Sequence, residues 1–319
     1  MVRHTKKPQL EQSKIIEELP AACASEEAAV EFLENKRWGE CEYCPKCGCV
    51  DVYKMTKRGS DERNARYLWR CRDCNKQYTV RTGTIYEESL IPLHKWCRAY
   101  WEACACKNGV SALELSRKIQ VSYKTALFMM HRIRWAMAED FTKPPKMTGT
   151  VEADETYVGG KPRYKGKNKR GRGTKKQPVA AVVQRQGSVR TRVIPTVNSI
   201  NVKAIVRDNV CPSSRVMTDQ EASYKGLAPE FASHESINHG AREYVRGDVH
   251  TNTIEGFFSR VKRGLNGTYH AVSREHLHRY LAQFEFAYNT RGLTDGERVI
   301  ALLKATEGKR LMYAEAVQE

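Results

Sequence analysis

The sequence predicts a mixed α/β fold, in which a sheet is packed against helices, behind an N-terminal region of different character. Three observations support this prediction. Strand-like runs follow residue 145 and then alternate with helical segments, as in layered folds. Apolar residues between residues 91 and 140 recur with a spacing near that of an α-helix. Two Cys-x-x-Cys pairs lie between residues 41 and 90, which precede both the helical region and the strands.

The composition favours a nucleic-acid partner. The 319 residues are enough for two or three domains, and the net charge of +17 comes from 54 Lys and Arg against 37 Asp and Glu. An anionic membrane surface is the competing interpretation, but we find no apolar run of about 18 residues and no basic amphipathic helix. The N-terminus shows no apolar secretory signal, so we expect a cytoplasmic, nucleoid-associated protein. In such a reducing compartment, clustered cysteines are more often metal ligands than disulfides.

The cysteine pairs predict a structural zinc site. Residues 1–24 are expected to form an N-terminal extension, and a short helix within residues 21–40 leads into the cysteine-rich segment. About 23 residues separate the sequences CPKC and CRDC. Zinc prefers four tetrahedral ligands, and each Cys-x-x-Cys turn aims two sulfurs at one point. We therefore predict a zinc ribbon at residues 25–90, and its expected ligands are Cys44, Cys47, Cys71 and Cys74.

Other cysteines complicate this assignment. Cys41 forms an alternative pair with Cys44, and Cys49 lies nearby. We prefer the pair that starts at Cys44 because Pro45 and Gly48 supply the turn around it. The remaining cysteines are expected to pack in the core, and they are Cys23, Cys97, Cys104, Cys106 and Cys211.

Residues 91–143 predict a helix-turn-helix segment. A first helix is expected over residues 112–119, Val121 lies in the turn, and Ser122 is a good N-cap for a second helix. In a helix-turn-helix the start of the second helix contacts bases in the major groove. The expected contacts are therefore Ser122, Tyr123 and Lys124, although an ordinary helical hairpin would have the same pattern.

The sheet is expected after Pro144-Pro145, which breaks the chain. Gly187-Ser188 is a hairpin signal between two strands. One helix is expected at residues 201–210, one or two at residues 251–291, and a last one with a frayed end within residues 293–319. The expected strands are residues 148–160, 178–186, 189–197, 214–220 and 242–247.

Three acids within this region are candidate metal ligands. Asp154 lies within a strand, Asp219 ends one, and Glu255 lies near the start of a helix. A buried acid needs a cation or hydrogen bonds, and Mg²⁺ is usually held by carboxylates and substrate phosphates. Each acid alone is more often a cap or turn residue, but 35 residues separate Asp219 from Glu255 and Lys262 follows Glu255 by two helical turns. A lysine at that position is suited to contact a DNA phosphate beside the metal.

At this point the chain resembles a known family, the zinc-ribbon insertion-sequence transposases of the DDE, RNase H-like superfamily. The resemblance covers residues 25 to about 292 and rests on CPKCG…CRDC, ADETYVGGK, VMTDQEASY, HTNTIEGFFSRVKRGLNGTYH and HLHRYLAQFEFAYNTR. It implies an RNase H-like catalytic domain at residues 148–292, followed by a C-terminal tail at residues 293–319. By position, Asp154 and Asp219 match the first two metal-binding acids.

The third position is open between two residues. The family often has Asn there, and Asn252 lies three residues before Glu255 on the same helical face. We favour Glu255 because a carboxylate binds Mg²⁺ more strongly than an amide, and because Lys262 has the matching spacing.

The resemblance also implies a reaction and its partners. With Mg²⁺ or Mn²⁺, water would hydrolyse the phosphodiester at each transposon end, and the freed 3′-hydroxyl would attack target DNA. Double-stranded DNA is the expected partner. A homodimer or higher oligomer is expected because two ends must be joined.

A basic loop follows the first acid. Residues 161–176 carry nine Lys or Arg among glycines, which predicts a flexible arm that grips phosphates, with a solvated surface loop as the alternative. The expected phosphate contacts are Lys165, Lys167, Arg170 and Arg172 in the loop and Lys262 and Arg263 in the later helix.

Two other functions remain open from the sequence. A DNA-binding regulator, derived from a transposase but without catalysis, would keep the ribbon and the paired helices. It would not need Asp154, Asp219 and Glu255 together, and all three are present. An RNase H-like nuclease acting on RNA or branched DNA would share the acids without needing to recognise transposon ends.

Overall fold

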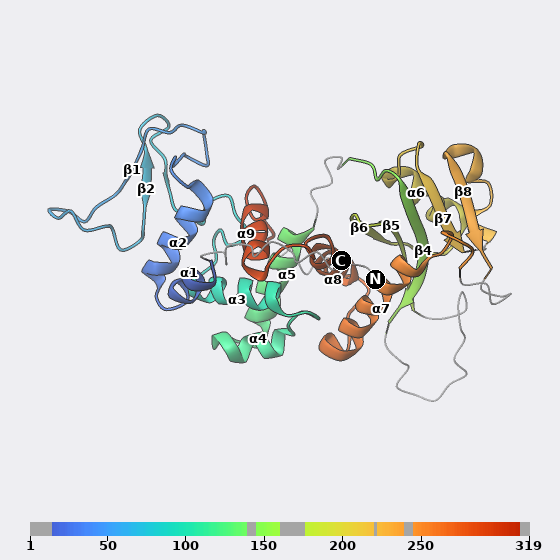
Figure 1. Ribbon diagram of the computed structural model, residues 1–319. Coiled ribbons are helices and arrows are strands. Elements are labelled where there is room, and N and C mark those ends of the chain that lie inside the picture. Colours follow the sequence, from blue (N-terminus) through green and yellow to red (C-terminus); the bar gives the residue numbers. More distant parts are fainter. Residues whose placement is uncertain (1–14, 139–144, 160–175, 220–221, 239–244, 313–319) are drawn as a thin grey trace, which may run out of the picture. The chain divides into compact units, whose positions relative to one another are not determined.

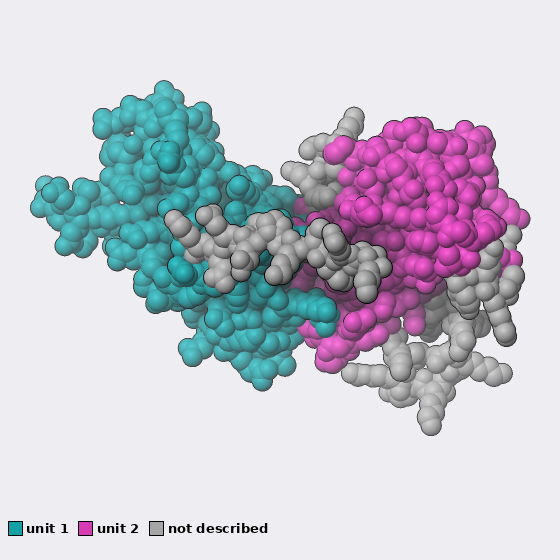
Figure 2. Space-filling view, viewed as in Figure 1, with its two compact units in different colours: residues 1–137, 292–319 teal, residues 138–291 magenta. Residues whose placement is uncertain are grey.

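The computed structural model describes residues 15–138, 145–159, 176–219, 222–238 and 245–312 (Figure 1). The chain divides into two compact units (Figure 2). The first comprises residues 1–137 together with residues 292–319, and the second comprises residues 138–291. No helix in the described ranges is both long enough and apolar enough to cross a membrane.

Six helices of the first unit lie within the described residues. They are α1 (Ile15–Ala22), α2 (Glu26–Trp38), α3 (Leu93–Ala105), α4 (Ala112–Ile119), α5 (Tyr123–Met137) and α9 (Asp295–Ala305). Ser25 and Ser111 cap α2 and α4, because each hydroxyl accepts a hydrogen bond from a first-turn amide. Trp96 and Tyr100 of α3 are fully buried at the centre of this helical core.

A small antiparallel sheet adjoins α2. Its strands β1 (Val52–Lys54), β2 (Trp69–Cys71) and β3 (Gln77–Tyr78) pair in the order β1-β2-β3. Trp38, at the end of α2, meets Trp69 edge-on at 5.3 Å between ring centroids and Tyr78 at 6.0 Å. Such a short sheet buries little by itself, so this aromatic cluster anchors it to the helix.

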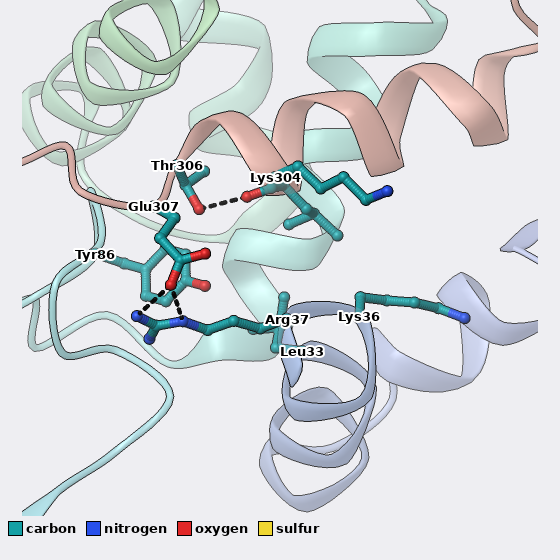
Figure 3. A pocket seen from close by; sticks show the side chains of 8 residues that line it. Leu33, Lys36, Arg37, Tyr86, Lys304, Thr306 and Glu307 are labelled. Carbon is teal, nitrogen blue, oxygen red and sulfur yellow. Dashed lines mark hydrogen bonds and ion pairs between the residues drawn. The ribbon is translucent and has the colours of Figure 1, made fainter. Parts of the chain in front are cut away.

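The C-terminal segment is an integral part of the first unit. Arg37 of α2 donates hydrogen bonds to the carbonyls of Val80 and Thr82, both at 2.8 Å, and pairs with Glu307, which follows α9 (Figure 3). Gly308 N–H donates to the carbonyl of Gly83 at 2.9 Å. The cavity beside these groups has a volume of only about 70 Å³, and Figure 3 shows the ion pair at its wall. We therefore regard it as a packing gap where α2 and the end of α9 meet.

The second unit contains one mixed five-stranded sheet. Its strands are β4 (Thr150–Val158), β5 (Gln177–Gln184), β6 (Val189–Val193), β7 (Arg215–Asp219) and β8 (Ser233–Ile237). The order is β6-β5-β4-β7-β8, with β4, β5 and β6 antiparallel and β4, β7 and β8 parallel. This sheet with flanking helices confirms the predicted fold class.

Helices cover both faces of the sheet. α6 (Ser199–Asn209) packs on one face, where its Val202 joins Val151 and Ala153 of β4 in one core. α7 (Asn252–Gly264) and α8 (Leu277–Asn289) pack on the other face, where Phe257 and Phe284 join a second core. Since side chains alternate along a strand, the even-numbered residues of β4 face α7.

Three local features differ from the sequence prediction. The strand β8 was not predicted, because SHESI is polar and half-buried and has no apolar alternation. Of the strand predicted at residues 242–247, the first three residues lie outside the described ranges, and Arg246 makes only an isolated bridge to Val249. In the predicted helical region, α7 continues into a π-helix at Leu265–Tyr269 before α8 begins.

Candidate active site and zinc centre

The four predicted zinc ligands form one cluster. The sulfurs of Cys44, Cys47, Cys71 and Cys74 all lie within 4.8 Å of one another. Two of the distances are 3.7 Å, from Cys44 to Cys74, and 3.6 Å, from Cys47 to Cys71. Four sulfurs placed about 2.3 Å from a tetrahedral zinc lie about 3.8 Å apart, far beyond the roughly 2.05 Å of a disulfide. The cluster therefore has the size of a zinc–thiolate site.

Local backbone geometry explains why these cysteines converge. Gly48 has φ +78° and donates its N–H to the Cys44 carbonyl at 2.8 Å, while Cys44 N–H donates to the Cys49 carbonyl at 2.8 Å. The left-handed glycine closes the turn that presents both sulfurs of the first pair. Cys41 is exposed and lies outside the cluster, as does Cys49, which resolves the alternative pairing in favour of Cys44 and Cys47. Cys97 and Cys104 are buried in α3, as predicted, whereas Cys23, Cys106 and Cys211 are only half-buried.

Asp154 and Asp219 lie at the same level of neighbouring parallel strands. β4 and β7 pair in parallel with Glu152 opposite Met217, and each aspartate follows two residues after its member of that pair. Because side chains alternate along a strand, both aspartates project from the same face of the sheet as Glu152 and Met217, and the charge of Asp219 reaches Asp154. Both residues are half-buried.

The acids influence one another electrostatically. Burial raises the pKa of Asp154 well above its usual value, and the negative charges of Glu155, Asp219 and Glu255 raise this pKa further. The Glu155 N–H, which donates to Asp154 Oδ1 at 2.7 Å, opposes this rise. Asp154, Asp219 and Glu255 thus share one negative region. Among the described residues, however, only the four cysteines bring three or more candidate ligand atoms within 4.8 Å of one another.

α7 carries the remaining candidates on an exposed surface. Asn252 is its first residue, and Glu255 follows one turn later, where its Oε1 accepts a hydrogen bond from Thr251 Oγ1 at 3.1 Å. Lys262 and Arg263 lie in the last turn. All four candidates are exposed, so this geometry does not choose between Asn252 and Glu255 as the third ligand.

Sequence reasoning missed the role of Glu152. No role was predicted for this residue, yet its side chain is fully buried and accepts hydrogen bonds from the first turn of α7. Its position two residues before Asp154 on a strand was the available signal, because that spacing puts both acids on one face. On the opposite face, Glu155 accepts a hydrogen bond from the buried hydroxyl of Tyr224 at 2.9 Å.

The predicted helix-turn-helix elements are present in the first unit. Gln120, with φ +52°, ends α4, and Ser122 Oγ accepts a hydrogen bond from Thr125 N–H at 3.1 Å at the start of α5. Tyr123 and Lys124 are exposed beside this cap. The three candidate base-contacting residues are therefore accessible at one helix end.

The predicted basic arm lies outside the described residues. This applies to Lys165, Lys167, Arg170 and Arg172, so their role stays a prediction.

Comparison with known proteins now decides the family. Residues 146–289 match the ISXO2-like transposase domain, and residues 24–77 match the transposase zinc-ribbon domain. An uncharacterized protein in the transposable element ISH50 of Halobacterium salinarum is 33% identical over 276 residues, which cover 82% of this chain and 90% of that protein. The chain belongs to the ISXO2-like transposase family. The cysteine cluster is accordingly the site of its zinc ribbon, and zinc is the metal that this site supports.

Further similarities are more limited. An uncharacterized transposase-like protein of Haemophilus influenzae is 34% identical over 101 residues, covering 32% of this transposase and 80% of that protein. A chain of the simian T-cell lymphotropic virus intasome in complex with a PP2A regulatory subunit aligns with a TM-score of 0.29 and 11% identity, over 58% of this chain and 66% of that one. A chain of the pre-cleavage Mos1 transpososome aligns with a TM-score of 0.28 and 14% identity, over 64% of this chain and 76% of that one. Scores this low support no structural or functional conclusion.

Proposed function

We propose that this transposase binds the ends of its element, hydrolyses a phosphodiester bond at each end and joins the freed 3′-hydroxyls to target DNA. One observation carries the proposal: Asp154 and Asp219 project at one level from neighbouring parallel strands, and their negative region includes Glu255 of α7. A regulator without catalysis would gain nothing from concentrating negative charge on a protein that must approach phosphates.

The donor set fits a hard divalent cation. Carboxylate oxygens are the protein ligands that Mg²⁺ prefers, and Mg²⁺ uses few of them because it keeps waters or substrate phosphates. Asp154, Asp219 and either Glu255 or Asn252 would hold Mg²⁺ or Mn²⁺. When bound, such ions would supply activation of the attacking oxygen and stabilisation of the leaving oxygen in phosphodiester transfer. The half-buried aspartates repel each other, and a cation between them would relieve that repulsion.

Other residues of the chain would hold the DNA. Lys262 and Arg263 are exposed in the last turn of α7, where positive side chains suit a DNA phosphate. Ser122, Tyr123 and Lys124 are exposed at the start of α5 and would contact the transposon end in the major groove. The arm that contains Lys165, Lys167, Arg170 and Arg172 would add phosphate contacts. A homodimer or higher oligomer would hold two ends together.

The proposal predicts cleavage that depends on a divalent cation. A DNA duplex carrying one transposon end should be cut at that end when Mg²⁺ or Mn²⁺ is added, and it should stay intact with the ions chelated. Specific binding of the end without cleavage under any of these conditions would instead indicate the DNA-binding regulator.

Substitution on α7 tests which residue occupies the third position. Glu255→Gln should reduce cleavage by more than the roughly 10- to 100-fold that is typical of a residue outside the ligand set, because it removes a charged ligand. Asn252→Ala should reduce cleavage by about 100-fold or less. Both variants are exposed on the same helical face, so each serves as the other's control for folding. The opposite order of effects would assign the third position to Asn252.

A further inference from the structure

The acid two residues before Asp154 has an unusual position. Glu152 is fully buried within β4, on the strand face that α7 covers. Burying a carboxylate is expensive unless hydrogen bonds or opposite charge replace its water. Arg185 Nε donates to Glu152 Oε1 at 2.7 Å, and the same carboxylate accepts three hydrogen bonds from α7.

These three bonds come from the start of the helix. Thr253 N–H and Ile254 N–H donate to Glu152 Oε2 at 2.9 Å and 3.0 Å, and Thr253 Oγ1 donates to Oε1 at 2.8 Å. The first amides of a helix lack intrahelical acceptors, and the positive end of the helix dipole attracts an anion there. The N-cap Thr251 directs its hydroxyl to Glu255. A carboxylate from a strand about a hundred residues earlier thus caps α7.

Arg185 extends the same contact to the loop before the helix. Besides pairing with Glu152, it donates to the carbonyl of Asp248 at 2.8 Å and to that of His250 at 2.9 Å. His250 Nδ1 also lies 3.3 Å from Glu152 Oε1. The loop and the first turn of α7 are therefore both tied to β4 through one ion pair, whose carboxylate is buried and whose guanidinium is partly exposed.

The position of this contact matters for the acids. Glu152 and Asp154 lie two residues apart on one face of β4, and Ile254 immediately precedes Glu255. We propose that Glu152 is a positioning residue, which holds the start of α7 against β4 and so sets the place of Glu255 relative to Asp154. This inference rests on the proposed function, because Glu152 matters in this way only if Glu255 and Asp154 bind the metal of that reaction.

The test compares metal binding with helix anchoring. Glu152→Gln keeps the shape of the side chain but removes its charge and one acceptor oxygen. The affinity for Mn²⁺ alone, measured by the loss of the free-ion EPR signal, should fall by about 10- to 100-fold. This is the usual effect of removing a group that orients metal ligands. Hydrogen exchange of the amides of Thr253 and Ile254 should also accelerate in the metal-free protein, because their acceptor is weakened.

A matched control is available in the same unit. Glu285 of α8 is also a buried carboxylate that joins a helix to a strand, since it accepts a hydrogen bond from Thr191 N–H at 2.7 Å. Glu285→Gln should leave Mn²⁺ binding unchanged. Thr253→Val removes only the Oγ1 donor and should weaken Mn²⁺ binding by a few-fold. This variant keeps the test possible if Glu152→Gln does not fold.

The outcomes separate the two proposals. Weaker Mn²⁺ binding and faster amide exchange in the Glu152 or Thr253 variants, against an unchanged Glu285 variant, supports the positioning role. Wild-type-like Mn²⁺ affinity in folded variants overturns it while leaving the proposed function intact. Absence of Mn²⁺ binding in the wild-type protein overturns the proposed function itself.

Discussion

Removal of one zinc ligand is the perturbation whose effect follows most directly from the geometry. Cys71 is fully buried at the end of β2, and its sulfur lies 3.6 Å from that of Cys47. The strands of the ribbon have only three, three and two residues, so they cannot supply much stability themselves. We therefore expect Cys71→Ser to lose zinc and, with it, the packed structure of the ribbon.

The size of the effect can be estimated from the ligand count. A structural zinc site contributes about 10–16 kcal/mol of apparent binding free energy at neutral pH. Shared equally over four thiolates, this is about 2.5–4 kcal/mol for each ligand, or roughly a 60- to 700-fold loss of zinc affinity. Wild-type protein should retain one zinc per chain after dialysis against a chelator of intermediate affinity, and Cys71→Ser should retain almost none.

Two measurements report the loss of zinc and of the packed ribbon. Metal analysis gives the zinc content, and tryptophan fluorescence reports the ribbon because Trp38 and Trp69 pack edge-on at 5.3 Å close to the cluster. Cys41→Ser is the matched control, since Cys41 is exposed and outside the cluster, and it should keep its zinc. A Cys71→Ser protein with full zinc content and unchanged fluorescence would refute the assignment.

Two further predictions concern the first unit. Arg37→Ala should lower the free energy of unfolding by about 2–3 kcal/mol in denaturant titration, because it removes charged hydrogen bonds to two backbone carbonyls. Glu307→Gln should lower it by less than about 1 kcal/mol, since Glu307 is 42% exposed, and equal effects would contradict this account of α9 docking. Lys124→Ala should weaken binding to transposon-end DNA by about 1–3 kcal/mol more than binding to unrelated DNA, whereas equal losses on both DNAs would exclude a base contact at the start of α5.

Features that depend on local chemistry were predictable from the sequence. The spacing of the cysteine pairs and the glycine after Cys47 identified the ribbon, because four thiolates converge wherever two such turns face each other. Ser122 was also predictable as an N-cap, because its hydroxyl binds an amide only three residues later in the chain. The strands that carry Asp154 and Asp219 were predictable from the short segments TVEADETYV and RVMTD, whose Val, Thr and Tyr residues favour strands.

Features that depend on distant pairing were not predictable. That Asp154 and Asp219 lie at one level depends on the register of β4 with β7, which no local pattern encodes. The polar strand β8 forms because the parallel edge of β7 offers backbone hydrogen-bonding groups, not because SHESI favours a strand. The role of Glu152 depends on contacts with amides 101 and 102 residues later in the chain. Each of these features becomes visible only when the sheet and α7 are assembled.

Cleavage of transposon-end DNA by aspartate variants tests the central claim most directly. Asp154→Asn and Asp219→Asn preserve side-chain volume and relieve the repulsion between the acids, so both proteins should fold at least as stably as the wild type. With Mg²⁺ or Mn²⁺ present, each should bind the end DNA with wild-type affinity and cut it at a rate indistinguishable from the background. Cleavage near the wild-type rate by either variant would contradict the assignment of these aspartates as the metal-binding acids of the reaction.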